Sequence, residues 1–156
     1  MSEKLLPRSG RHSWTKVWIV ETPLLSHIAH DHIEFDIMRN ALWTDPDDQS
    51  LWFYHQFLMF SLLNPSMSFV PHFTTSQRED YARSQIEELE EMLDGAEECK
   101  WIYNGLLEYT LAICGLLERE PNEEEKESLR TWLEKLKKLD PTRSGRCQAR
   151  EAILRL

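Results

Sequence analysis

Glycine is scarce in this sequence, with 5 residues among 156, and the alternation of apolar and polar residues that marks β-strands is nearly absent. Apolar residues recur instead three and four residues apart, which is the spacing of an amphipathic helix. The composition, 41% hydrophobic and 29% charged, is that of an ordinary single domain. We therefore predict an all-α fold.

Basic residues are outnumbered, since 18 Lys and Arg face 27 Asp and Glu, and the formal net charge is -9. This balance argues against nucleic acid or an anionic membrane surface as the main partner, because such contacts are built from clustered Lys and Arg. No stretch approaches the roughly 18 consecutive apolar residues that a membrane span needs. We expect a protein that does not span a membrane.

Cysteine is rare as well. Cys99, Cys114 and Cys147 are an odd number of thiols, and their spacing matches no zinc or redox motif. Reduced thiols in a cytoplasmic protein are the simplest interpretation.

Catalytic motifs are also missing. The sequence has no glycine-rich phosphate loop, no G-x-S-x-G motif and no His-Glu pair at metalloprotease spacing. His27, His30 and His32 lie close together, but helical rotation separates His30 from His32 by about 200°, so the three do not share a face. We assign no catalytic, cofactor-binding or metal-binding residue.

Five positions have the chemistry of a helix N-cap, either Asp followed by Pro or a polar residue followed by Glu three positions later. They are Asp45, Ser76, Asp94, Asn122 and Asp140. These starts predict six helices, at residues 33–44, 46–63, 77–93, 95–118, 123–139 and 141–155.

Aligning Asp45, Asp94 and Asp140 indicates an internal repeat of two helices. Trp52 and Trp101 each lie seven residues after their Asp. A repeat of 46 to 49 residues is typical of an α-solenoid of antiparallel helical hairpins. We predict hairpins at about 33–63, 77–118 and 123–155 within a repeat domain of residues 33–156. Residues 1–32 do not align and form an atypical lead-in.

Residues 42–59, LWTDPDDQSLWFYHQFLM, carry a family resemblance. With the CKW of residues 99–101 and the later KKLDPTRSGRC, this segment resembles the helical repeats of protein prenyltransferase α subunits. Residues 42–59 are closer to the α subunit of type 2 protein geranylgeranyltransferase than to the α subunit shared by farnesyltransferase and the type 1 enzyme. The two later segments resemble the last, C-terminal repeats of its fungal versions.

The resemblance implies an enzyme that transfers geranylgeranyl from geranylgeranyl diphosphate to the C-terminal cysteines of Rab GTPases. It implies a heterodimer with a β subunit that holds the catalytic zinc, and a Rab escort protein that presents the substrate. This chain would be part of the α subunit and would need its partner for activity. The alternative is a non-catalytic helical-repeat scaffold or protein-binding module, which the same periodicity supports.

Two roles are predicted for the aromatic residues of the repeat. Trp52 and Trp101 are expected to pack within the repeat, with Asp45, Asp94 and Asp140 as caps. Because neighbouring residues on a helix differ by about 100°, Trp52, Tyr54 and His55 cannot all point the same way. By resemblance, Tyr54, His55 and Tyr103 are the candidate contacts with a β subunit.

Overall fold

The structure is a computed structural model that describes residues 25–66, 73–143, 145 and 150–152. These residues contain helices and no strand, which confirms the predicted all-α class. The helices are α1 (Leu25–Thr44), α2 (Gln49–Leu63), α3 (Thr75–Met92), α4 (Lys100–Leu116) and α5 (Glu123–Leu139), followed by the short 3-10 helix η2 (Pro141–Arg143).

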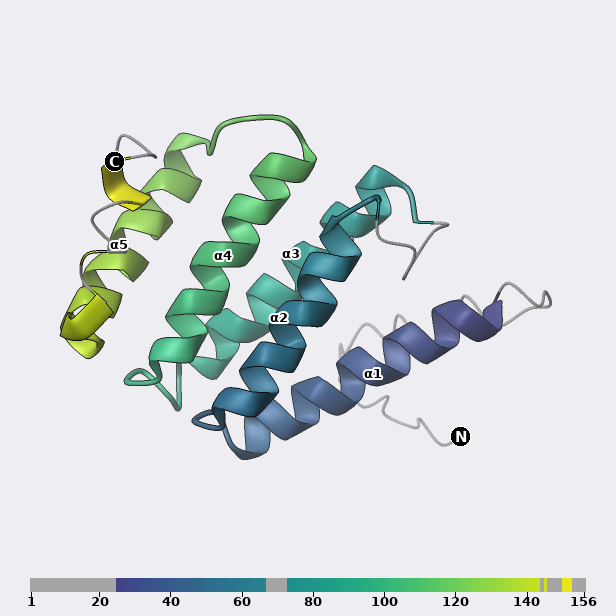
Figure 1. Cartoon of the computed structure of the whole chain (residues 1–156), viewed down its shortest axis with the longest axis horizontal. Coiled ribbons are helices and arrows are strands. Elements are labelled where there is room, and N and C mark those ends of the chain that lie inside the picture. The colour runs from purple at the N-terminus through teal and green to yellow at the C-terminus, as the bar shows by residue number, and fades with distance from the viewer. Residues whose placement is uncertain (1–24, 67–72, 144, 146–149, 153–156) are drawn as a thin grey trace, which may run out of the picture.

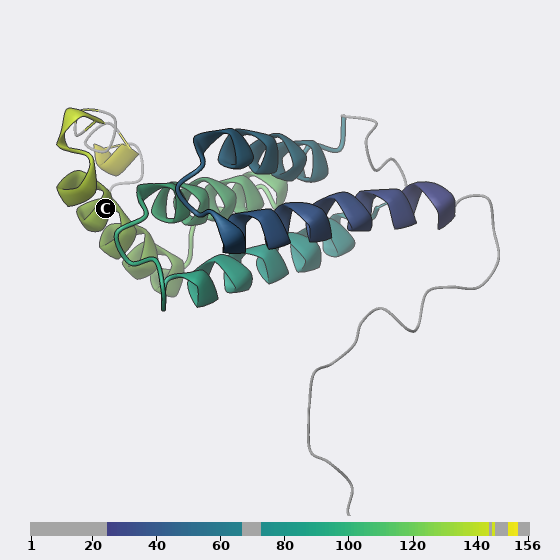
Figure 2. The same ribbon diagram turned by 90° about the horizontal axis from the view of Figure 1, so that it is seen from below.

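The helices stack as antiparallel hairpins, as the α-solenoid prediction requires (Figure 1). In the second view, α2 lies above α1 and α4 lies above α3, so the second helices of the two hairpins share one layer (Figure 2). Within this arrangement α4 packs against α2, α3 and α5. It is therefore the central helix of the described stack.

The predicted helix start at Asn122 is confirmed. Its side chain accepts a hydrogen bond from the Glu125 N–H at 2.8 Å, and the Glu125 carboxylate accepts from the Asn122 N–H at 2.9 Å. This reciprocal pair satisfies two backbone donors that a helix start leaves open.

The predicted cap at Asp45 is wrong. The Asp45 N–H donates to the Ala41 carbonyl at 2.9 Å, so this residue still belongs to the end of α1. The cap of α2 is Asp48, whose carboxylate accepts from the Ser50 N–H at 2.8 Å. A turn of residues 45–48 separates the two helices.

The cap of α3 is likewise shifted by two residues. Thr74 and Gln77 form the capping box, in place of the predicted pair Ser76 and Glu79. A capping box is present as predicted, but its first residue is Thr74, the first of three successive hydroxyl residues at positions 74–76.

Asp94 does not cap α4. Its N–H donates to the Glu91 carbonyl, and the N–H of Gly95 donates to Met92, so consecutive turns follow the end of α3. The helix α4 begins only at Lys100, after Cys99, which makes no side-chain cap bond.

Asp140 is the C-cap of α5, and it directly precedes η2, which begins at Pro141 as predicted. Its N–H donates to the Leu136 carbonyl at 2.8 Å, and its carboxylate pairs with Lys100 at 3.1 Å. Of the predicted helix 141–155, residues 141–143 form η2, while residues 145 and 150–152 are helical. The remainder of that helix lies outside the described residues.

The predicted start of the first helix, at residue 33, is also too late. Because α1 already begins at Leu25, the division proposed between residues 32 and 33 falls inside a helix. Residues 1–24 of the predicted lead-in lie outside the described part of the chain.

The structural repeat has a different register from the predicted one. Trp52 is the fourth residue of α2, and its Nε1–H donates to the Pro46 carbonyl at 2.7 Å. Tyr103 is the fourth residue of α4, and its hydroxyl donates to the Glu97 carbonyl at 3.0 Å. Each bond reaches back six residues. Trp52 therefore corresponds to Tyr103.

Trp101 packs against the core cluster, but it is less buried than Trp52. Trp52 is buried, whereas Trp101 is only partly buried. The Trp101 ring meets the edge of Phe53, and the Lys100 ammonium lies 5.2 Å from its centroid. Trp101 thus lies at the margin of the core.

The core depends on a close approach between helices at Gly105. A methyl group at this position would lie 3.1 Å from Leu89 Cδ1 and 3.4 Å from Trp52 Cζ3. Real Cβ atoms rarely come this close to their neighbours, so a larger side chain would force α2 and α3 away from α4.

We expect Gly105→Leu to lower the free energy of unfolding by about 1–3 kcal/mol, because overpacking outweighs the gain in helix propensity. Urea unfolding followed by circular dichroism measures this. Gly115→Leu is the matched control, since Gly115 lies in α4 with open space around it. Its stability should change by less than about 1 kcal/mol, towards greater stability. Equal effects at both positions would contradict the role of Gly105.

Candidate partner-binding surface

The large exposed apolar side chains gather on two neighbouring helices. All seven of those found among the described residues lie on α1 or α2: Ile33, Ile37, Trp43, Phe53, Tyr54, Phe57 and Phe60. Four of them form what we call the aromatic row: Phe53, Tyr54, Phe57 and Phe60. Exposed apolar residues that gather in this way mark candidate interaction surfaces.

The aromatic row lies on the side of α2 that faces away from the core. Residues of the opposite side, such as Trp52 and Met59, are at most 3% exposed, whereas Phe53 is 55% and Phe57 is 49% exposed. An ordinary surface helix carries charged or polar groups on its outer face. This helix carries aromatic rings there instead.

Contacts with both neighbouring helices hold the aromatic row in place. Phe53 meets Trp101 and Phe60 meets Tyr109, both on α4, with ring centroids 6.0 and 6.4 Å apart. At the other side, the Tyr54 hydroxyl donates to Glu34 on α1 at 2.8 Å, and this bond raises the pKa of Tyr54. The rings are thus ordered before any partner binds, which reduces the entropy cost of association.

Of the three predicted partner contacts, Tyr54 lies on this surface, with 43% of its area exposed. His55 does not, because it shares the inner face of α2 with Trp52 and Met59 and is 2% exposed. Tyr103 is also buried, at 8% exposed, and its hydroxyl bonds to a backbone carbonyl. The predictions for His55 and Tyr103 as surface contacts are therefore wrong.

His55 instead forms the centre of a buried polar network. Its Nδ1 lies 2.8 Å from the Tyr109 hydroxyl, and its Nε2 lies 3.3 Å from Gln85 Oε1. Burial lowers the pKa of His55 to about 4 and raises the pKa of Tyr109. At neutral pH the tyrosine hydroxyl therefore donates to Nδ1 of a neutral imidazole, and Nε2–H donates to the glutamine. The network joins α2, α3 and α4.

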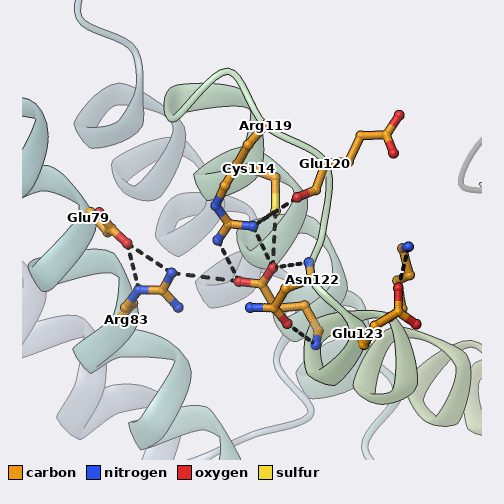
Figure 3. Close-up of polar contacts among 9 residues, drawn as sticks. Glu79, Arg83, Cys114, Arg119, Glu120, Asn122 and Glu123 are labelled. Carbon is orange, nitrogen blue, oxygen red and sulfur yellow. Dashed lines mark hydrogen bonds and ion pairs between the residues drawn. The ribbon is translucent and has the colours of Figure 1, made fainter.

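A second polar cluster links α3 to the turn between α4 and α5 (Figure 3). Arg119 donates two hydrogen bonds to Glu125, at 2.7 and 2.8 Å. Arg83 lies 3.6 Å from the same carboxylate and pairs with Glu79 at 2.9 Å. The bonds from Arg119 lower the pKa of Glu125 to about 2. These charges neutralise one another, so the cluster is a structural link between helices.

Within the described residues, no group of three or more His, Cys, Asp and Glu side chains is placed to hold a metal ion. The side chains of His27, His30 and His32 lie outside the described set. Among the helices that the structure describes, none is both long enough and apolar enough to cross a membrane.

Two relatives of the chain share one name. The geranylgeranyl transferase type-2 subunit alpha of Schizosaccharomyces pombe is 34% identical over 115 residues, which is 72% of this chain and 33% of the relative. The protein of the same name from Dictyostelium discoideum is 28% identical over 110 residues, or 69% of this chain and 30% of the relative. No protein-family model matches. The chain spans about a third of the length of these curated relatives.

We expect Glu125→Gln to lower the free energy of unfolding at pH 7 by about 1–3 kcal/mol, because it removes charge-assisted bonds but keeps an amide that can form the capping box. The folded carboxylate binds its proton near pH 2, below its ordinary value of 4.5. Its stabilisation is therefore complete above about pH 4.5 and is lost as the pH falls towards 2. Unfolding free energies measured across this range should converge for the two proteins. Glu127→Gln, which removes an exposed pair with Arg130, should change stability by less than about 0.5 kcal/mol.

The buried imidazole predicts a second pH dependence at higher pH. The pKa of His55 falls from its ordinary value of 6.5 to about 4 on folding, so the unfolded chain binds the proton more readily between these values. Stability is complete above about pH 6.5 and declines towards pH 4. Between pH 7 and 4.5 the wild type should lose about 2 kcal/mol more than His55→Gln, measured by urea unfolding. Equal losses in both proteins would show that His55 does not titrate in this way.

Proposed function

Since the chain is homologous to geranylgeranyl transferase type-2 α subunits, we propose that it forms part of the α subunit of a protein geranylgeranyltransferase that modifies Rab GTPases. It would act in the cytoplasm as one member of a heterodimer with a β subunit. The observation that carries the proposal is the homology over 72% of the chain, in a fold of stacked antiparallel hairpins.

In this proposal the chain supplies a surface and the partner supplies the reacting groups. The β subunit would hold a zinc ion that lowers the pKa of a C-terminal cysteine of the Rab protein, so that the thiol would release its proton to solvent and become a thiolate. The thiolate would attack the first carbon of geranylgeranyl diphosphate, and diphosphate would leave. Among the residues of this chain, Tyr54 is the proposed contact with the β subunit because it is exposed and held by Glu34.

The buried polar groups fit a scaffolding role within the heterodimer. The imidazole of His55 is closed off from solvent, and both carboxylate oxygens of Glu125 are held by neighbouring donors. Such groups stabilise the helical stack but do not reach a substrate. The proposed contribution of this chain to catalysis is therefore to hold its partner and the escort protein in place.

A reconstitution experiment tests the proposal. The chain is co-expressed with a type 2 β subunit, and transfer of labelled geranylgeranyl to a Rab protein is measured with escort protein present. We expect a complex with the β subunit, and transfer that depends on both subunits. A parallel reaction uses a full-length α subunit, such as that of one of the relatives, to show that the other components are active.

The outcomes separate the two functions that the fold allows. A complex that also transfers lipid supports the proposed enzyme subunit. A complex without transfer, while the longer α chain is active, supports the alternative of a non-catalytic binding module. The proposal is wrong if this chain forms no complex under conditions in which the longer α chain does.

A further inference from the structure

The charged side chains next to the aromatic row in the sequence are all acidic. Between Arg39 and Arg78 the sequence contains no Lys or Arg, so α2 and both turns beside it lack a cation. Three exposed carboxylates, those of Asp45, Asp47 and Asp48, lie at the N-terminal end of α2. An apolar face thus ends in a patch of negative charge.

Two cations on the helices beside α2 are already engaged. Lys100 pairs with Asp140 at 3.1 Å and lies over the Trp101 ring. Arg39 pairs with Glu88 at 3.0 Å and with Asp36 at 3.1 Å. In the described part of the chain these two cations pair with other carboxylates, namely those of Asp140, Glu88 and Asp36.

We propose that the aromatic row binds an apolar surface of the β subunit that carries Lys or Arg at one edge, and that this edge meets the acidic turn before α2. The proposal rests on the proposed function for the identity of the partner and adds the surface and its chemistry. Aromatic residues are enriched in the core of protein interfaces, where a few residues provide most of the binding energy. Charges at the rim mainly set orientation and the rate of association.

The apolar part of the proposal is tested by truncating the row. Phe53→Ala and Phe57→Ala should each weaken binding of the purified β subunit at least tenfold, measured by surface plasmon resonance. Both side chains are about half exposed, so the variants should lower the urea midpoint only slightly and remain folded in the binding assay. Trp43→Ala is the matched control, because Trp43 is an equally exposed aromatic residue on α1, outside the row. It should change the affinity less than twofold.

The electrostatic part is tested at Asp45. Its replacement removes an exposed charge and leaves the Asp48 cap in place. Asp45→Lys should slow association severalfold at low salt, and Asp45→Asn should have a smaller effect in the same direction. Both differences should shrink in about 0.5 M salt, where the Debye length is only a few ångströms. An unchanged association rate in Asp45→Lys would overturn the proposed cationic edge.

The results distinguish this inference from the function on which it rests. If the wild type binds the β subunit and the row variants bind equally well, the aromatic row is not the interface, but the proposed function stands. If the longer α chain binds the β subunit and this chain does not, the proposed function of this chain is wrong. The inference is then wrong as well. Sedimentation of the wild type shows whether a second copy covers the row. A dimer that the row variants convert to a monomer would assign the surface to self-association and overturn the proposal.

Discussion

The close approach of α2 and α3 to α4 at Gly105 is the contact on which the rest of this structure depends. The absence of a side chain there lets Trp52 and Leu89 come close to the α4 backbone. At this separation the His55 ring can reach both Gln85 on α3 and Tyr109 on α4. The polar centre of the core is therefore possible because the apolar packing around it is tight, and its satisfied bonds in turn set the positions of three helices.

Capping chemistry predicts the helix start at Asn122 but not the start at Asp94, which lies in the turns after α3. Asn122 follows a proline and has Glu125 at the required spacing, and the structure has the predicted box. Before α3, three successive hydroxyl residues could each serve, and Thr74 is chosen by the reciprocal bond with Gln77. The turn before α2 offers three Asp residues in the same way. In such runs several residues have suitable chemistry, so the sequence restricts the helix start to a few positions but does not identify one of them.

The candidate surface could be predicted only in part, for a related reason. Helical rotation shows that Tyr54 and His55 point about 100° apart, but not which of them faces the core. Both side chains have an apolar body and a polar end, so either can be buried when partners exist. The partners of His55 are Gln85 and Tyr109, which lie 30 and 54 residues further along the chain. No local pattern contains that information, so the burial of His55 follows from its distant partners and not from the sequence around it.

The register of the repeat connects the core to the surface. In α2 the fourth residue is Trp52, and in α4 it is Tyr103, so both aromatic side chains close the turn before their helix with a bond to a backbone carbonyl. This pairing places Trp101 two residues earlier in its helix than Trp52. Trp101 therefore does not take the buried position that Trp52 has in α2, and it is only partly buried. It packs instead against Phe53, and so extends the aromatic surface of α2 onto the next hairpin.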